Sequence, residues 1–242
     1  MGDSSGPPAA PMASEDERAS LTSRVIPTMS LSTIDNPLTA PLPPVSSTSP
    51  SERAAARFSI EGNAVLTGGA GTLALASARA LLEHGLSALT LMDLRSTIDN
   101  SSQSITELKQ EFPDIPIHAV HVDVTSESAI EKAFGDARSL MGSIDILCCF
   151  AGIVGCVHSI SATASQFRKV VDVNLNGSFL CAQAAAKHMI DSRNGGSILF
   201  TASISAHSTN YPQPQAAYNS EMFGLADALW DEWGTSRRSP DQ

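Results

Sequence analysis

The sequence has little basic charge and lacks any long run of apolar residues. Its 242 residues include 15 Lys and Arg against 25 Asp and Glu, a formal net charge of −10 at pH 7. Binding to a phosphate backbone depends on basic side chains that release counterions, so this balance argues against a nucleic acid as partner. No apolar run approaches the roughly 20 residues that span a bilayer, so we expect no membrane partner either.

Cysteine is scarce, and signals for export are missing. The four cysteines lie in apolar or helical text rather than at the spacing of metal ligands or of a disulfide framework. The first residues lack the basic and apolar regions of a secretory signal. Gly6 stands where a myristoylation signal has Ser or Thr. We therefore expect a cytoplasmic protein with neither a metal site nor disulfides.

Residues 1–57 differ in composition from the rest of the chain. They contain nine of the 14 prolines and no Phe, Tyr or Trp. Such a segment cannot bury enough apolar surface to offset the entropy of ordering it. We predict a disordered tail over residues 1–57, with a short helix around 51–57 as its one candidate element. A folded domain over residues 58–242 is expected to follow, long enough for a sizeable core.

From Phe58 onward, apolar runs typical of buried strands alternate with patterns typical of helices. We predict strands over residues 63–67, 88–92, 117–122, 144–149 and 197–201. Helices are predicted over residues 73–84, 101–111, 127–141, 162–190 and 215–233. Apolar strands that alternate with helices build a parallel sheet with helices on both faces. The sequence therefore predicts an α/β fold, a doubly wound parallel sheet of the Rossmann type.

A glycine-rich turn joins the first predicted strand to the first predicted helix. The stretch Thr67-Gly68-Gly69-Ala70-Gly71-Thr72-Leu73-Ala74 contains the Gly-x-Gly-x-x-Ala pattern of a dinucleotide-binding turn. Glycines there permit a tight turn and close approach of a pyrophosphate, which the helix N-terminus then holds. The plainer alternative is an ordinary strand-to-helix turn.

Asp93 ends the second predicted strand, where a carboxylate accepts hydrogen bonds from the adenosine ribose of a dinucleotide. The same carboxylate would repel a 2′-phosphate, so we predict NAD as the cofactor rather than NADP. Arg95, two residues further on, is the one feature that would weaken this preference. The plainer alternative for Asp93 is an acidic loop or capping residue.

On these residues the chain resembles the short-chain dehydrogenase/reductase family, over about residues 58–220. Asp123-Val124 matches the family's Asp-Val pair that contacts the adenine. The family's Asn-Asn-Ala-Gly motif appears as Cys149-Phe150-Ala151-Gly152, in which only the Ala-Gly half is kept. The resemblance thus implies a nicotinamide dinucleotide site. The residues assigned to it are Gly68, Gly69, Gly71, Thr72, Leu73, Asp93, Asp123, Val124, Ala151 and Gly152.

The resemblance also implies a catalytic set. In the family, a tyrosine acts as general acid/base on an alcohol or carbonyl oxygen, a serine hydrogen-bonds that oxygen, and an asparagine and a lysine support them. The matching residues are Asn174, Ser203 and Tyr218, with Ser205 as a second candidate for the serine. The stretch Pro-Gln-Pro-Gln-Ala-Ala-Tyr-Asn around Tyr218 resembles the fungal polyol and sugar-alcohol dehydrogenase branch.

The family's lysine, four residues after the tyrosine, has no match because Met222 occupies that position. The residues between Tyr218 and Trp233 suggest a small deletion or a misjoined exon. The resemblance implies a sheet that is incomplete at its C-terminal edge. One hypothesis is an NAD-dependent oxidoreductase that transfers hydride between nicotinamide and a secondary alcohol or ketone, such as a polyol or sugar. The alternative is a catalytically silent cofactor-binding or interaction protein, or a truncated product. The resemblance leaves a homo-oligomer open, although the elements that usually build subunit contacts are altered.

Overall fold

The computed structural model describes residues 49–192, 195–206 and 212–221. Contacts within the chain divide it into Met1–Ser49 and Pro50–Gln242, and all described residues except Ser49 belong to the second unit. Of the predicted tail, residues 1–48 lie outside the described part. The next residues form a short helix, α2 (Pro50–Ala56), with no buried residue. No helix among the described residues is long and apolar enough to cross a membrane.

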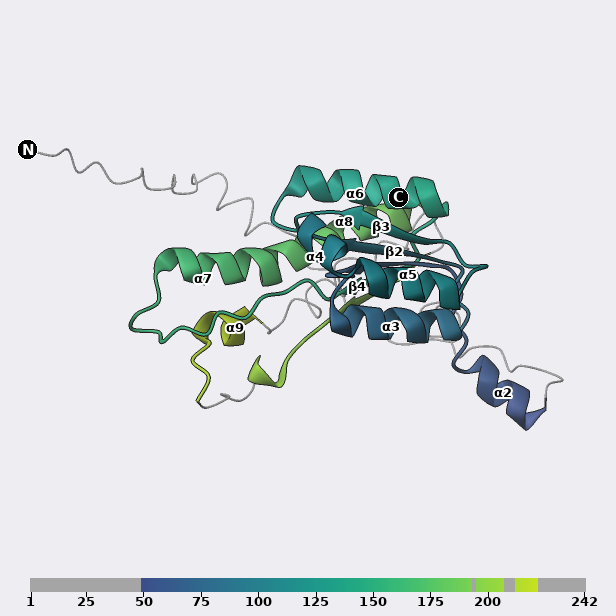
Figure 1. Ribbon diagram of the computed structural model, residues 1–242, viewed down its shortest axis with the longest axis horizontal. Helices are drawn as coiled ribbons and strands as arrows, with labels where there is room; N and C mark the ends of the chain where they lie inside the picture. Colours follow the sequence, from purple (N-terminus) through teal and green to yellow (C-terminus); the bar gives the residue numbers. More distant parts are fainter. Residues whose placement is uncertain (1–48, 193–194, 207–211, 222–242) are drawn as a thin grey trace, which may run out of the picture. The chain divides into compact units, whose positions relative to one another are not determined.

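Five parallel strands form one sheet in the order β3-β2-β1-β4-β5 (Figure 1). Their bounds are β1 (Asn63–Thr67), β2 (Ala88–Asp93), β3 (Ile117–His121), β4 (Ile146–Cys149) and β5 (Ser197–Phe200). The order reverses between β1 and β4, which pair in parallel with Thr67 opposite Cys149. Ligands of open parallel sheets bind beyond the carboxyl ends of the strands at such a reversal. The predicted doubly wound parallel sheet is confirmed.

Helices cover both faces of this sheet (Figure 1). On one face lie α3 (Thr72–Glu83) and α5 (Ser102–Glu111), and α4 (Arg95–Asn100) precedes α5. On the other face lie α6 (Glu127–Met141) and α8 (Gly177–Ser192), which pack against each other. The predicted helices 73–84, 101–111 and 127–141 correspond to α3, α5 and α6, whereas α4 was not predicted.

The core consists of two apolar layers, one on each side of the sheet. Successive strand residues point to opposite faces, so Val65 packs toward α6 and α8, while Leu66 packs toward α3 and α5. The adjacent cysteines divide in the same way: Cys148 lies in the layer beneath α3 and α5, and Cys149 lies in the layer beneath α6 and α8. Burial raises the pKa of the Cys148 thiol to about 11. Both cysteines are therefore small buried hydrophobes, as predicted.

The predicted continuous helix over residues 162–190 is interrupted. It consists of α7 (Ala164–Val171), a π turn (Asp172–Asn176) and α8. A π turn holds one more residue per hydrogen-bonded loop than an α-helix and is frequent at functional sites. Immediately after the turn, a Cβ on Gly177 would lie 2.9 Å from Cγ2 of Val124, so α8 starts in close contact with the loop after β3.

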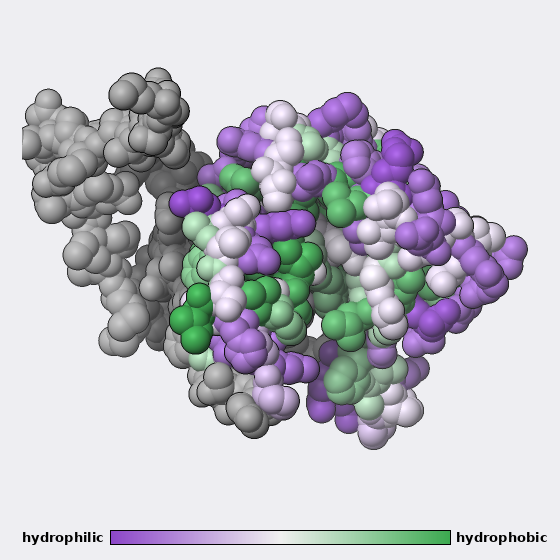
Figure 2. Space-filling model, turned by 60° about the vertical axis from the view of Figure 1, so that its left-hand side comes forward, coloured by the Kyte–Doolittle hydropathy of each residue, from purple (hydrophilic) through white to green (hydrophobic). Residues whose placement is uncertain are grey.

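The last described elements follow β5. A short 3-10 turn (Ile204–Ala206) is followed by α9 (Ala216–Glu221), the described part of the predicted helix 215–233. Within the described residues β5 pairs with β4 alone, and Leu199 on β5 is 52% exposed. Figure 2 shows apolar residues on both sides of a recess near the middle of that view, while the outer surface is mostly polar.

Candidate active site

The glycine turn after β1 is packed too closely to hold side chains at Gly68 and Gly69. Gly68 has a φ of +61°, and a Cβ there would lie 2.6 Å from the backbone nitrogen of Ala151. A Cβ on Gly69 would lie 2.5 Å from the carbonyl oxygen of Leu66. The amide of Gly69 also donates a 2.9 Å hydrogen bond to the carbonyl of Met92, at the end of β2. The turn is thereby wedged between β2 and the loop after β4.

The turn leads directly into the N-terminus of α3. Gly71 is the N-cap residue and provides no side-chain hydrogen bond to the first turn of the helix. The side chains of Thr72 and Leu73 are exposed at this end, Leu73 to 70%. A helix N-terminus presents backbone N–H groups and the positive end of the helix dipole, which suit an anion. The predicted turn therefore fits the pyrophosphate of a dinucleotide.

Asp93 links the glycine turn to the end of β2. Its Oδ2 accepts a hydrogen bond from the amide of Ala70 at 3.1 Å, and its Oδ1 accepts one from the amide of Leu94 at 2.8 Å. An ionised carboxylate has about four acceptor sites. Two acceptor sites therefore remain, as many as the hydroxyls of an adenosine ribose. Asp93 thus makes a structural contact with the turn, and its role as a ribose ligand stays a prediction.

Asp123 and Val124 follow β3 at the same edge of the sheet. The amide of Val122 donates to the carbonyl of Asp93 at 2.9 Å, which ties the ends of β3 and β2 together. Oδ1 of Asp123 accepts hydrogen bonds from the amide and the hydroxyl of Thr125, at 3.0 and 2.7 Å. These two bonds lower the pKa of the Asp123 carboxyl, and the bond from the amide has the larger effect. Val124 is buried, so the pair combines an exposed anion with an apolar side chain.

The carboxamide of Asn174 joins the π turn to the loop after β4. Its Oδ1 accepts a hydrogen bond from the amide of Ile153 at 2.8 Å, and its Nδ2 donates one to the carbonyl of Ile153 at 2.9 Å. Asn174 is 6% exposed. Ala151 and Gly152 lie in the same loop, and Ala151 meets Gly68 as described above. The glycine turn and the predicted catalytic asparagine therefore both contact one short segment, residues 151–153 in the loop after β4.

The elements that carry the other predicted catalytic residues also meet. Helix α9, which contains the half-buried Tyr218, packs against α7, the π turn and the 3-10 turn. Ser203 immediately precedes the 3-10 turn, and its Oγ accepts a 3.2 Å hydrogen bond from the amide of Ser205. The fold thus brings together the three segments that contain Asn174, Ser203 and Tyr218. Met222 lies outside the described residues.

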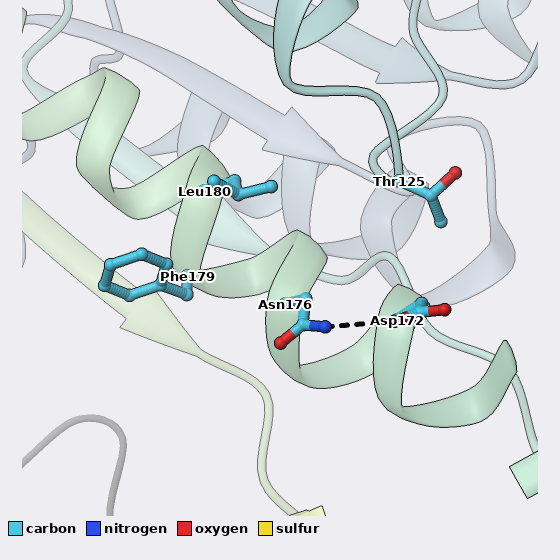
Figure 3. A pocket seen from close by; sticks show the side chains of 5 residues that line it. All are labelled: Thr125, Asp172, Asn176, Phe179 and Leu180. Carbon is cyan, nitrogen blue, oxygen red and sulfur yellow. Dashed lines mark hydrogen bonds between the residues drawn. The ribbon is translucent and has the colours of Figure 1, made fainter. Parts of the chain in front are cut away.

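Two features of this region were not predicted from the sequence. Gln215 is buried and donates a hydrogen bond from Nε2 to Oγ of Ser205 at 3.1 Å. A hollow of about 530 Å³ lies beside the π turn and is lined by Thr125, Asp172, Asn176, Phe179 and Leu180 (Figure 3). Within this lining, Nδ2 of Asn176 donates a hydrogen bond to Oδ1 of Asp172 at 3.0 Å. None of the predicted site residues lines this hollow. A glutamine in a proline-rich stretch gives no signal of burial in the sequence.

Residues 62–229 match the family model described as short chain dehydrogenase. The chain belongs to the short-chain dehydrogenase family. The predicted membership is therefore confirmed, and with it the assignment to an oxidoreductase family. One similar curated protein is the NADP-dependent mannitol dehydrogenase of Alternaria alternata, which is 30% identical over 182 residues, covering 73% of this chain and 67% of the relative.

Solved structures of short-chain dehydrogenases share this fold. A short-chain type dehydrogenase/reductase from Mycobacterium marinum has a TM-score of 0.67 at 26% identity and covers 74% of this chain and 72% of its own. An NAD⁺-bound xylitol dehydrogenase has a TM-score of 0.65 at 25% identity, and the match covers 74% of this chain and 67% of the xylitol dehydrogenase chain. The similar proteins differ in cofactor, because the mannitol dehydrogenase is named for NADP and the xylitol dehydrogenase structure contains NAD⁺.

Proposed function

We propose that this short-chain dehydrogenase binds NAD and transfers hydride between the nicotinamide and a secondary alcohol or ketone, such as a polyol or sugar. The observation that carries the proposal is the pairing of Asp93 with the glycine turn at the reversal of strand order. The turn has no room for side chains, the N-terminus of α3 has no side-chain cap, and a carboxylate with unused acceptor sites stands beside both.

The preference for NAD follows from charge. The Asp93 carboxylate would accept hydrogen bonds from ribose hydroxyls, whereas a 2′-phosphate in the same place would face it with like charge. Asp123 adds a second anion at the same edge, and its lowered pKa keeps it ionised at neutral pH. Arg95 begins α4 with an exposed side chain and is the residue that would offset these two carboxylates.

In the proposed reaction the bound cofactor accepts or supplies the hydride, and the residues of this chain handle the proton and the reacting oxygen. Tyr218 exchanges a proton with the substrate oxygen through its phenolic hydroxyl. Ser203 donates a hydrogen bond to the same oxygen, while its own Oγ accepts from the amide of Ser205. Asn174 holds the loop after β4, which contains Ala151 and Gly152, against the π turn.

Support for a polyol or sugar as substrate comes from the mannitol and xylitol dehydrogenases among the similar proteins. The small-molecule partner would enter beyond the carboxyl ends of β4 and β5, where Ser203 and Gly152 lie. The described cysteines are free, and three of the four are buried, which fits the reducing cytoplasm that we propose as the location.

A second candidate function is favoured by Met222. General acid/base catalysis by a tyrosine is most efficient when the pKa of its hydroxyl lies near the working pH, and a neighbouring cation such as the family's lysine lowers that pKa. With methionine at the position of the family's lysine, the chain would bind cofactor but turn over alcohols slowly or not at all. It would then serve as a catalytically silent cofactor-binding protein.

Cofactor choice is tested by titrating the purified protein with NADH and NADPH. We expect NADH to bind more tightly by at least about tenfold, roughly 1.4 kcal/mol. Asp93→Asn retains one acceptor oxygen for the amide of Ala70 but removes the charge, and it should bring the two affinities close together. Asp114→Ala removes an exposed carboxylate from the loop before β3, at the opposite edge of the sheet, and should leave the ratio unchanged. Equal affinities in the unmodified protein would contradict the proposal.

Turnover separates the two candidate functions. The assay follows NADH formation with NAD and a panel of polyols and other secondary alcohols. Turnover that Tyr218→Phe abolishes would support the dehydrogenase. Tight NADH binding without turnover on any alcohol or ketone would support the silent cofactor-binding protein instead.

A further inference from the structure

Gln215 is a polar residue in the interior, 4% exposed, although the stretch around it is rich in proline and glutamine. A buried amide needs hydrogen-bond partners, because leaving it unpaired costs free energy. The partner of its Nε2 is Oγ of Ser205, at 3.1 Å, and Ser205 is itself only 3% exposed. The bond joins residues ten positions apart in the sequence, Gln215 immediately before α9 and Ser205 in the 3-10 turn.

One end of this bond is anchored next to a predicted catalytic residue, and the other end is bonded to one. The carbonyl of Gln215 accepts a hydrogen bond from the amide of Asn219 at 3.0 Å, which anchors Gln215 to the first turn of α9, next to Tyr218. At the other end, the amide of Ser205 donates to Oγ of Ser203. A short path of hydrogen bonds therefore runs from the tyrosine helix through Gln215 and Ser205 to the serine hydroxyl.

We propose that Gln215 is a positioning residue, which, together with Ser205, holds the Ser203 hydroxyl and the Tyr218 helix in a fixed relation. The inference rests on the proposed function, because it takes Ser203 and Tyr218 as the catalytic pair. It also assigns the two serines different tasks. Ser205 is buried and receives the Gln215 bond, while Ser203 is only half-buried and can present its O–H to a substrate oxygen.

The geometry explains why the amide is needed. Ser203 Oγ accepts from the amide of Ser205, so its own hydrogen is directed away from that amide, toward another acceptor. The direction of this hydroxyl relative to Tyr218 depends on the place of the 3-10 turn relative to α9. The Gln215 side chain, immediately before α9, provides a buried hydrogen bond from this end of the helix to the 3-10 turn.

The variants that test this are Gln215→Leu, which keeps the approximate size and removes the donor, and Ser205→Ala, which removes the acceptor with a smaller change. Gln213→Leu is the matched control, because Gln213 is a glutamine of the same loop with an exposed side chain. We expect Gln215→Leu and Ser205→Ala to lower kcat by about ten- to a hundredfold, with KM for NAD changed less than about twofold. Gln213→Leu should resemble the unmodified protein.

Non-additivity distinguishes positioning from general stabilisation. If Gln215 acts through Ser203, then Ser203→Ala should cost much less in the Gln215→Leu background than in the unmodified protein. Fully additive effects on kcat, or equal losses in kcat and in NAD affinity, would overturn the positioning role. Ser205→Ala provides the same test should Gln215→Leu fail to fold.

A measurement without turnover separates this proposal from the proposed function. The chain has only two tyrosines, so 3-fluorotyrosine gives two fluorine resonances, and Tyr218→Phe identifies that of Tyr218. Ser203→Ala should shift the Tyr218 resonance in the otherwise unmodified protein and leave it nearly unmoved in the Gln215→Leu background. This result with no turnover would reject the dehydrogenase activity and keep the positioning role. Equal shifts in both backgrounds would overturn the positioning role whether or not the protein turns over.

Discussion

Replacing Asn174 by alanine removes the side chain that connects the π turn to the loop after β4. Both hydrogen bonds of the carboxamide go to the backbone of Ile153, one in each direction, at 2.8 and 2.9 Å. The residue is 6% exposed and Ile153 is half-buried, so water would replace these bonds only in part. Asn174→Ala should therefore destabilise the folded domain as well as the proposed site.

The size of the effect follows from the two backbone groups that lose their partner. Leaving a buried donor or acceptor unpaired costs about 1–3 kcal/mol, and partial hydration of Ile153 favours the lower end of this range for each group. The free energy of unfolding should thus fall by about 2 kcal/mol. For a domain of this length, that corresponds to a Tm lower by roughly 4–8 °C. Urea unfolding followed by far-ultraviolet circular dichroism measures the change in free energy, with the slope checked for constancy.

Asn176→Ala is the matched control for this prediction. Asn176 lies in the same π turn, but its side chain is exposed and bonds only to the exposed Asp172 among the described partners. Its removal should change the free energy of unfolding by less than about 0.5 kcal/mol. Equal stability of the Asn174→Ala and Asn176→Ala proteins would refute the reasoning, because burial and the two bonds to Ile153 are what distinguish the two residues.

Two further predictions concern glycine conformation and thiol exposure. Gly135 and Gly142 both have open space where a Cβ would stand, but Gly142 has a φ of +87°. Gly135→Ala, within α6, should raise the free energy of unfolding by about 0.5–1 kcal/mol. Gly142→Ala should lower it by about 1–2 kcal/mol, because its backbone conformation disfavours a side chain. A thermal melt in which both changes act in the same direction would contradict this. A thiol reagent at pH 8 should label one cysteine of the native protein, Cys156, and all four after unfolding. The other three, Cys148, Cys149 and Cys181, are buried, and burial raises the pKa of the Cys181 thiol to about 12. Cys156→Ser should abolish the native reaction, and rapid labelling that persists in that variant would show that the buried cysteines are accessible.

The sheet was predictable because its strands carry their own signal. Apolar runs such as residues 63–67 and 88–92, separated by helical patterns, imply parallel strands buried on both faces, and the structure has strands there. The break in the long helix before α8 was not predictable in the same way. It coincides with bonds between Asn174 and Ile153, 21 residues apart in the sequence, and hydrophobic periodicity contains no information about such a contact.

The candidate site shows the same division. The glycine turn was predictable because a positive φ at Gly68 and the close approach of Ala151 leave no alternative to glycine. Asp93 was predicted as a ribose ligand, and its bond to the amide of Ala70 adds a structural task that spacing alone does not indicate. Gln215 was missed because Pro-Gln-Pro-Gln is typical of an exposed loop, and its burial depends on where Ser205 lies in the folded chain.

The two halves of the site are therefore held by different kinds of contact. On the proposed cofactor side, the turn is fixed by backbone hydrogen bonds, by the close packing at Gly68 and Gly69, and by side-chain bonds of Asp93 and Ser101 to the backbone of Ala70. A single side-chain change nearby therefore removes only part of these contacts. On the proposed catalytic side, the contacts come from two buried side chains, Asn174 bonded to Ile153 and Gln215 bonded to Ser205. Single substitutions should thus remove turnover more readily than cofactor binding. A dehydrogenase with methionine at position 222 is then expected to keep its affinity for the dinucleotide even if its tyrosine has become a poor acid and base.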